Sequence, residues 1–399
     1  MKIQGKKTRV SVVGMNAVCG AGFNKYQIYD NVLNEKSSVN TRGLAPIDSQ
    51  AWETYLSTVV IPGEFKVNRS LPWLFHCLQD SIRESGWDSL EQVGIIFAST
   101  TSSIDCWENE LPLFEEDRGE SLEKLISHQS LAEPLQVLTK YWGIKGPQVL
   151  LSSSCSASLQ ALALGALWIE TGFVDRCIVA TSEVLSNLTA TGFEALRLLS
   201  KDICKPFAKD RNGINLGEAA GVICLESTEK LSDNKKCLGF ISGYGFSSDA
   251  FHPTSPEPAG EGSVRAIRAA LDKAGLEPDE IDWIYAHGTA SKGNDAAELE
   301  AFKNIFGHTS LPTVFSSKPI HGHTLAASGV LESIIGLMAL SENKKLELAA
   351  NESSLLNSNL DLKSKDEKKA GKSNRVSSHI LKNSLGFGGI NVALVLSRN

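Results

Sequence analysis

Short apolar runs alternate along the chain with longer segments in which apolar residues recur at helical spacing. Runs of this kind, rich in Val and Ile, are typical of buried strands. They are RVSVVG (9–14), VGIIFAS (93–99), QVLLSS (148–153), RCIVATS (176–182), AAGVICLE (219–226), WIYAHG (283–288), TVFSS (313–317) and NVALVLS (391–397). Helical spacing predicts helices over 71–85, 119–141, 156–171, 189–199, 263–275, 295–306 and 325–341. The alternation predicts a layered α/β protein.

The two halves of the chain repeat the same coarse order of segments. Each has a glycine-bearing strand start (VVGMNAVCGAG, GYGFSSD), then a helix, a hydrophobic strand and a small-residue turn that opens another helix. A charged, polar link near 228–237 separates them. We therefore predict two domains, 1–232 and 233–399, the first carrying a candidate nucleophile and the second two candidate histidines. A polar run at 358–375 is interpreted as a solvated loop, with a role in partner binding as the alternative.

Composition narrows the class of protein. The chain has 399 residues, of which 42% are hydrophobic and 21% charged, so a disordered chain is excluded. The net charge of -7 disfavours nucleic acid as a partner. No apolar run reaches the ~18 residues of a membrane span. Basic residues precede the first apolar stretch as in a weak signal peptide, but Gly14 and Asn16 interrupt it, so we interpret it as a strand.

Cysteine use points to a cytoplasmic protein without a metal centre. Eight cysteines in this length are too few for a disulfide framework, and no C-x-x-C pair occurs for a zinc site. One of them differs in its setting. Cys155 follows the apolar run Val149–Leu151 and a turn of small residues, and precedes a helix. The helix dipole there favours a thiolate by at most ~2 kcal/mol, so a nucleophile needs a second cation or donor. A packing role is the alternative, which suits Cys177 and Cys224 better.

Two histidines lie in comparable settings. His287 follows a strand and is succeeded by Asp295 and Glu298, which share one face of the next helix. His323 lies between a strand and a small-residue helix start, with Lys318 five residues before it. Spacing alone leaves His321 as a competitor for His323.

These segments together resemble a β-ketoacyl-acyl-carrier-protein synthase of the type II, decarboxylating, Cys-His-His kind, in the thiolase superfamily. The resemblance rests on the ordered blocks SSSCSAS, DRNGINLGEAAG with FSSDAFHPTSP, YAHGTASKGNDAAE, and SSKPIHGHTLAASG followed by NSLGFGG. It extends over essentially the whole chain. The fold that it implies is α/β, with two pseudo-symmetric βαβαβαββ halves forming a layered αβαβα sandwich.

The resemblance also implies a role for individual residues. Cys155 matches the nucleophile, His287 and His323 the paired histidines, and Lys318 a catalytic-site lysine with Glu298 as its expected partner. Asp295 matches a structural acid. Phe387 matches the gate residue, whose backbone N–H forms an oxyanion hole with that of Cys155. Thr289 and Ser291 match phosphopantetheine-binding hydroxyls, and Thr101 and Phe193 border the acyl pocket. Candidates for docking an acidic carrier protein are Lys66, Arg69, Arg197 and Lys201, for which ordinary surface charge is the alternative.

The implied reaction is a decarboxylative Claisen condensation of a Cys155-bound acyl group with malonyl-acyl-carrier protein, in fatty-acid, polyketide or aryl-polyene-type synthesis. It needs no bound cofactor beyond the carrier's phosphopantetheine arm. The resemblance implies a homodimer, or a heterodimer with a ketosynthase-like subunit. The alternative is a chain-length-factor-like partner subunit, against which Cys155 argues. A biosynthetic thiolase is disfavoured because no cysteine follows Cys237, and the Lys318–His323 block disfavours the Cys-His-Asn type. The segment Ala98–Ser102 departs from the family's glycine-rich turn and leaves the acyl chain length open.

Overall fold

The computed structural model describes residues 9–58, 60–65, 68–108, 130–232, 235–307, 311–344, 346 and 376–399. Ten strands form one sheet in the order β10-β9-β11-β12-β8-β1-β7-β5-β3-β4. Their bounds are β1 (Val10–Cys19), β3 (Gly94–Ala98), β4 (Gln148–Leu151), β5 (Arg176–Glu183), β7 (Ala219–Ser227), β8 (Gly239–Ser248), β9 (Trp283–Tyr285), β10 (Thr313–Phe315), β11 (His379–Gly386) and β12 (Ile390–Ser397). A separate two-stranded sheet pairs β2 (Leu44–Ala45) with β6 (Leu216–Gly217).

The large sheet consists of two halves with the same topology. The N-terminal half runs β1-β7-β5-β3-β4 and the C-terminal half runs β8-β12-β11-β9-β10. In each half the first two pairings are antiparallel and the last two are parallel. The halves join where Val10–Val12 of β1 pair with Gly239–Ile241 of β8. Two copies of one strand order are the pseudo-symmetry of the predicted fold.

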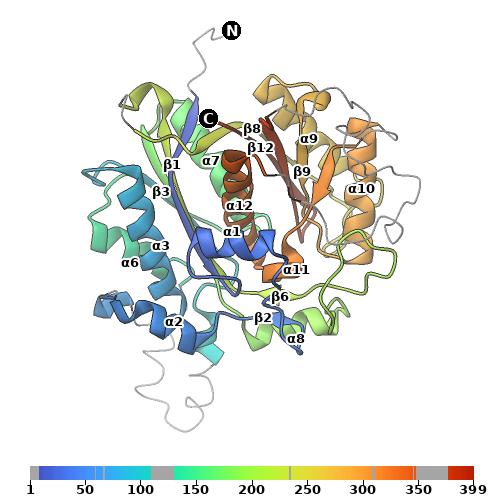
Figure 1. The fold of residues 1–399 in the computed structure, drawn as a ribbon, viewed down its shortest axis with the longest axis horizontal. Helices are drawn as coiled ribbons and strands as arrows, with labels where there is room; N and C mark the ends of the chain where they lie inside the picture. Colours follow the sequence, from blue (N-terminus) through green and yellow to red (C-terminus); the bar gives the residue numbers. More distant parts are fainter. Residues whose placement is uncertain are drawn as a thin grey trace.

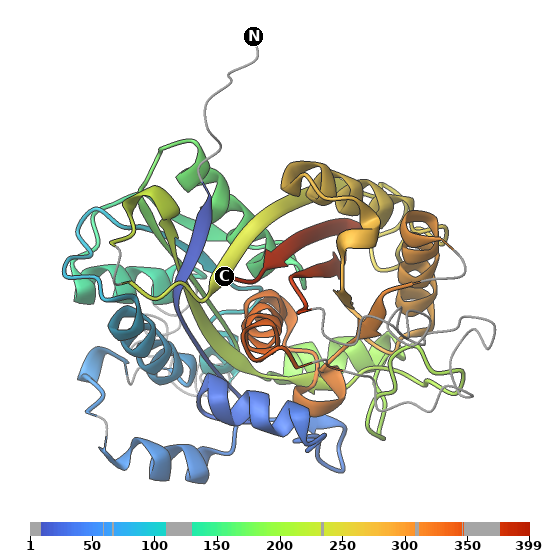
Figure 2. The ribbon, with the colours of Figure 1, turned by 45° about the horizontal axis from the view of Figure 1, so that its top comes forward.

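Helices cover the sheet halves outside and fill the space between them (Figure 1). Their bounds are α1 (Lys25–Leu33), α2 (Ser49–Tyr55), α3 (Ser70–Ser85), α6 (Glu133–Trp142), α7 (Ala157–Glu170), α8 (Asn187–Ala195), α9 (Glu261–Ala274), α10 (Lys292–Phe306), α11 (Lys318–His321) and α12 (Ser328–Glu342). Helix α3 packs on β1 and β7, and α9 packs on β8 and β12. Helices α7 and α12 contact strands of both halves, and Figure 2 shows the orange α12 between them. The layers are therefore α, β, α, β, α.

The two central helices meet at their N-terminal ends. A Cβ atom on Gly329 would lie 2.3 Å from the backbone nitrogen of Leu159, so only glycine permits this approach of α12 to α7. The hydroxyl of Ser158 donates to the carbonyl of Ala326 and accepts from the N–H of Val330, which locks the contact. Because Cys155 precedes α7 and His323 precedes α12, this contact brings the two candidate site residues together.

Each predicted apolar run is a strand of the structure. The runs omitted β11 and the two-residue strands β2 and β6, and of β8 only the glycine-bearing segment GYGFSSD was recognised. Strand β8 contains Gly243 and Gly245, where a Cβ would lie 2.1 Å from backbone oxygens of α9. Its apolar signal is weak because the helix packs directly on the strand backbone. Of the helix predicted at 119–141, residues 133–142 form α6 and residues 130–132 are not helical, whereas 119–129 lie outside the described residues, as does the polar run 358–375.

The first apolar stretch is a strand, as predicted. All ten residues of β1 are buried in the sheet. One segment, Leu325–Glu342, is long and apolar enough to cross a membrane, but 89% of it is buried inside the protein. It contains α12, and it is therefore the core helix between the two sheet halves.

Candidate active site

Cys155 lines a cavity whose walls come from both halves of the chain. The cavity has a volume of about 690 Å³, and its walls include His287 and His323. Cys155 follows Ser154, which has a φ of 52°, and precedes the first residue of α7. Its side chain belongs to a small apolar cluster with Phe193, Ile214, Leu216 and Leu325. The strand-to-helix turn predicted for this cysteine is present, and it directs the thiol into the cavity.

Burial determines the protonation state of the thiol more than the helix does. Desolvation raises the pKa of Cys155 to about 12. The charge of Lys318 and hydrogen bonds from the backbone N–H groups of Cys155 and Phe387 lower the pKa, while Glu183 raises it further. As predicted, the backbone N–H at the start of the helix favours the thiolate without sufficing for it, and Lys318 is the second cation that also lowers the pKa, although burial outweighs both. The two N–H groups predicted as an oxyanion hole do converge on the sulfur.

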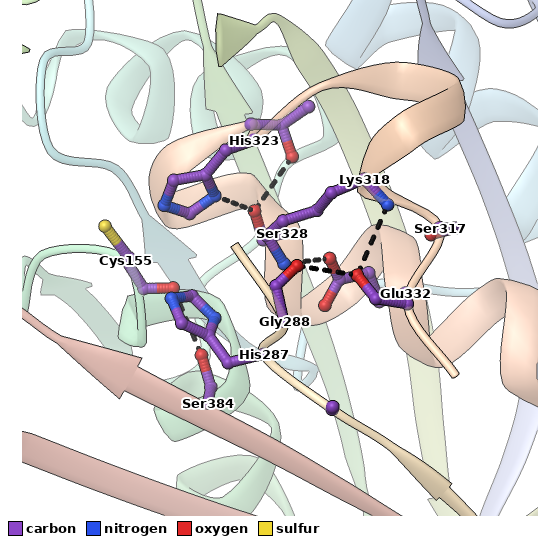
Figure 3. A network of polar contacts seen from close by, with 12 residues as sticks. Cys155, His287, Gly288, Ser317, Lys318, His323, Ser328, Glu332 and Ser384 are labelled. Atoms are coloured by element: carbon purple, nitrogen blue, oxygen red, sulfur yellow. Dashed lines mark hydrogen bonds and ion pairs between the residues drawn. The ribbon is translucent and has the colours of Figure 1, made fainter. Parts of the chain in front are cut away.

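The two histidines face each other beside Cys155 (Figure 3). Their ring centroids lie 5.2 Å apart and the rings are almost perpendicular, at 85°. Nδ1 of His323 and the hydroxyl of Ser328 form a hydrogen bond of 3.1 Å, which leaves Nε2 free to face the cavity. Nδ1 of His287 is buried without a hydrogen bond to the described residues. Burial first, and the charge of Lys318 second, lower the pKa of both histidines well below the usual value of 6.5. Both rings are therefore neutral hydrogen-bond donors.

Lys318 pairs with Glu332, and the prediction of Glu298 as its partner is wrong. The Lys318 Nζ and Glu332 Oε1 atoms lie 2.6 Å apart, and both side chains are buried (Figure 3). A second buried lysine, Lys382, lies 2.8 Å from Glu332 Oε2. The two cations lower the pKa of Glu332 to about 2, against the effect of its burial. Glu332 was missed because it lies in an apolar helix that follows the motif.

Glu298 holds the backbone around His287 instead. Its carboxylate accepts the N–H of His287 at 2.6 Å and that of Gly288 at 2.9 Å, and the amide of Asn383 at 3.0 Å. Desolvation raises its pKa. These bonds fix the turn that presents the imidazole of His287 to the cavity.

Asp295 ties two neighbouring loops together. Its carboxylate accepts the N–H groups of Phe207 at 2.7 Å and Ala290 at 3.1 Å, and Arg211 lies 3.7 Å away. Burial raises the pKa of Asp295 to about 6. Both loop residues that it holds have positive φ angles, 61° at Phe207 and 65° at Ala290, which these bonds stabilise.

Sequence spacing alone did not decide whether His321 or His323 is the second histidine of the site. In the structure the contacts of His321 are structural. Nδ1 lies 2.7 Å from the carbonyl of Gly322, and Nε2 lies 2.5 Å from the hydroxyl of Ser317. Both ring nitrogens are thereby occupied, and burial lowers the pKa of this histidine to about 4. His323, and not His321, faces the cavity.

The remaining predicted wall residues divide into two groups. Thr289, Ser291, Phe193 and Phe387 line the cavity, and the rings of Phe193 and Phe387 stack with centroids 5.5 Å apart. Thr101 does not line it. The hydroxyl of Thr101 donates to Glu183, a buried carboxylate that also accepts the backbone N–H of Thr101 at 3.3 Å.

The four basic residues predicted to dock an acidic carrier protein lie in different settings. Arg197 is exposed and lines the cavity, whereas Lys201 is exposed and is not one of the residues that line the cavity. Arg69 binds both oxygens of the buried Glu218, at 2.8 and 3.0 Å, so its charge has an internal partner. Lys66 lies outside the described residues.

A cysteine and two neutral histidines at the junction of two pseudo-symmetric halves define a protein of the thiolase superfamily. Family models sharpen this assignment. The N-terminal domain of β-ketoacyl synthase matches residues 66–231, and its C-terminal domain matches residues 238–348. The chain belongs to the β-ketoacyl synthase family.

Relatives with curated names agree with the family. The chain is 31% identical over 278 residues to 3-oxoacyl-[acyl-carrier-protein] synthase 2 of Staphylococcus aureus (strain COL), an alignment that covers 64% of this chain and 63% of the relative. It is 38% identical over 203 residues to nodulation protein E of Rhizobium sp. (strain N33), which covers 50% of each. These alignments therefore span less than two thirds of the relatives' length.

Solved structures match over the whole chain. The ketosynthase ApeO, in complex with its chain length factor ApeC from Xenorhabdus doucetiae, gives a TM-score of 0.80 at 26% identity and 100% coverage of both chains. A β-ketoacyl synthase from Burkholderia phymatum STM815 gives a TM-score of 0.83 at 22% identity, covering 98% of this chain and 100% of the other. The second likeness shows the fold alone.

Proposed function

We propose that the protein is a β-ketoacyl-acyl-carrier-protein synthase, which condenses an acyl group on Cys155 with malonyl-acyl-carrier protein. The observation that carries the proposal is the convergence of Cys155, His287 and His323 on one cavity with two backbone N–H groups at the sulfur. A thiol suits acyl transfer from a thioester, and paired neutral donors suit an enolate.

In the first half-reaction Cys155 takes the acyl group. Its sulfur attacks the carrier-bound thioester carbonyl, a new carbon–sulfur bond forms, and the carrier leaves as a free thiol that receives the proton of Cys155. The oxyanion of the intermediate lies between the N–H groups of Cys155 and Phe387. Because burial raises the thiol pKa to about 12, attack depends on Lys318 and these two donors to stabilise the developing negative charge.

In the second half-reaction malonyl-carrier loses CO2. The electrons of the broken carbon–carbon bond form an enolate, whose oxygen accepts hydrogen bonds from His287 and His323. The enolate carbon attacks the acyl-Cys155 carbonyl, the carbon–sulfur bond breaks, and the Cys155 thiolate takes up a proton. One such donor is worth about 10²–10³ in rate in comparable sites.

Access and partners follow from the walls of the cavity. Thr289 and Ser291, with hydroxyls 3.1 Å apart, suit the amides of a phosphopantetheine arm, and the proposed reaction requires no other cofactor. Arg197 and Lys201 are the basic candidates on the surface that suit an acidic carrier.

The solved ketosynthase–chain length factor complex supports a dimer, either of two copies or of this chain with a related subunit. Eight free thiols support a place in the cytoplasm.

Intact-mass analysis with a panel of acyl-carriers tests the proposal. Wild type is expected to gain one acyl mass, which is lost in Cys155→Ala. Cys204→Ala is the matched control, because burial raises the pKa of that thiol to about 12 as well, but it lies outside the cavity walls. If wild type takes an acyl group from no carrier, the proposal is wrong, and a partner subunit of the chain-length-factor kind is the better interpretation.

The roles of the two half-reactions are separable. His323→Ala is expected to accept the acyl group on Cys155 and to release little CO2 from malonyl-carrier. Unchanged CO2 release in this variant contradicts the role given to His323.

A further inference from the structure

Lys382 is a fully buried cation that no motif indicated and that the proposed reaction does not use directly. It lies in β11, and its ammonium group is 2.8 Å from Glu332, 2.5 Å from the carbonyl of Asn383 and 3.5 Å from the carbonyl of Ala286. Its charge also faces the ring of Tyr285, at 5.2 Å from the centroid. A buried lysine is costly, so its charged form requires partners.

The contacts of Lys382 connect both histidine segments. Ala286 immediately precedes His287, so Lys382 holds the strand end that carries this histidine. Glu332 holds Lys382 on one oxygen and Lys318 on the other, and Lys318 opens the segment that leads to His323. One carboxylate thus bridges the two loops through two lysines.

We propose that Lys382 is a positioning residue of the condensing reaction: with Glu332 and Lys318 it forms a buried triad of net charge +1 that joins the two histidine segments and keeps both imidazoles uncharged. The inference rests on the proposed function, since it assigns the histidines as neutral donors. Without Lys382, Lys318 and Glu332 form a neutral pair, and their field at the histidines largely cancels.

The surroundings of the histidines support this assignment. Charged or titratable groups around them include Cys155 before α7, Asp295 and Glu298 on α10, Lys318 and His321 on α11, Glu332 on α12 and Lys382 on β11. Glu298 is bound to backbone N–H groups and to Asn383, which stabilise its negative charge locally. Lys382 lowers the pKa of both histidines, alongside Lys318. An uncharged imidazole keeps one N–H for the enolate and leaves Nδ1 of His323 able to accept from Ser328.

The test is Lys382→Met, which keeps the apolar stem and removes the charge, while Glu332 retains Lys318. CO2 release from malonyl-carrier on the acyl-enzyme is followed from about pH 8 down to about pH 4.5. Removing one buried charge near the histidines raises their pKa by on the order of one unit, so protonation begins at a higher pH in the variant, and the ratio of wild-type to variant rates is expected to rise as the pH falls, by up to about tenfold. Acylation of Cys155 changes far less. Lys344→Met, in an exposed ion pair with Glu342, is the control and leaves the ratio flat.

A second variant that restores the net charge separates the electrostatic effect of Lys382 on the histidines from the effect of losing its packing. Lys382→Met with Glu332→Gln leaves Lys318 alone, so the net charge is again +1. The pH dependence of the ratio is expected to disappear in this double variant, whatever its absolute rate. A ratio that stays constant with pH in Lys382→Met, or a double variant with the same pH dependence as the single one, overturns the inference.

The failure of this inference is distinguishable from failure of the proposed function. NMR of ¹⁵N-labelled histidine reports the charge of the imidazoles without substrate. Imidazole protonation at a higher pH in Lys382→Met than in wild type supports the inference even if no acyl group is ever taken up. Identical histidine titrations in both proteins overturn it even if the enzyme condenses normally.

Discussion

The carboxylate of Glu332 lies between two buried lysines, and its removal is the sharpest test of how the site is held together. Glu332→Gln leaves the side-chain shape almost unchanged. It leaves Lys318 and Lys382, which lay 2.6 and 2.8 Å from the carboxylate, without their anionic partner. All three side chains are at most 1% exposed, so water does not replace the lost interaction.

The size of the effect follows from the pKa of Glu332. The folded protein lowers it from 4.5 to about 2, which corresponds to about 3 kcal/mol of stability. Breaking a buried ion pair by removal of one partner costs about 3–5 kcal/mol, in agreement. Since the pKa is depressed on folding, this stability is fully present above pH 4.5 and is lost as the pH falls through about 2.

Urea denaturation at neutral pH and fixed protein concentration, followed by tryptophan fluorescence, measures the change. Glu332→Gln is expected to lower the free energy of unfolding by about 3 kcal/mol. The matched control is Glu342→Gln, on the same helix, whose ion pair with Lys344 is exposed and worth less than about 1 kcal/mol. Equal stability of the two variants would refute the account of the triad.

Three further predictions concern the thiol, the helix contact and the His287 turn. Iodoacetamide should alkylate Cys155 about tenfold faster per pH unit between about pH 7 and 9, because the pKa of this thiol is about 12. The Cys155→Ser variant gives the background rate, and a plateau near pH 8 contradicts the raised pKa. Gly329→Ala should destabilise the protein by about 1–3 kcal/mol and slow acylation, because its Cβ would lie 2.3 Å from the backbone nitrogen of Leu159. The control is Gly192→Ala in α8, whose Cβ meets no atom within 4 Å and which should leave the melting temperature unchanged. Glu298→Gln should reduce CO2 release about tenfold or more while Cys155 still accepts the acyl group, because the anion that holds the N–H groups of His287 and Gly288 is lost. CO2 release at the wild-type rate would show that the turn at His287 does not depend on the charge of Glu298.

The order of apolar runs and motif blocks determined the fold class, and the blocks pointed to Cys155, His287 and His323. These features are local, because each depends only on residues that are close together in the sequence. They are a strand-to-helix turn, a histidine that follows a strand, and the change between strand and helix periodicity. Strand β11 escaped the same approach because Lys382, Asn383 and Ser384 make it look polar, although all three are buried. Their polarity serves contacts with Glu332, Glu298 and Cys155.

Tertiary structure decided which charges meet and what they do to the site. Lys318 has Glu298 twenty residues before it and Glu332 fourteen residues after it, and nothing in that spacing selects between them. Packing of α12 between the sheet halves places Glu332 against both lysines, while α10 aims Glu298 at the backbone of His287. The thiol pKa was likewise beyond the sequence, because the helix dipole is a local effect and desolvation depends on everything that surrounds the sulfur. Burial and long-range pairing arise only when the two halves close on each other, and so they are decided by the folded structure.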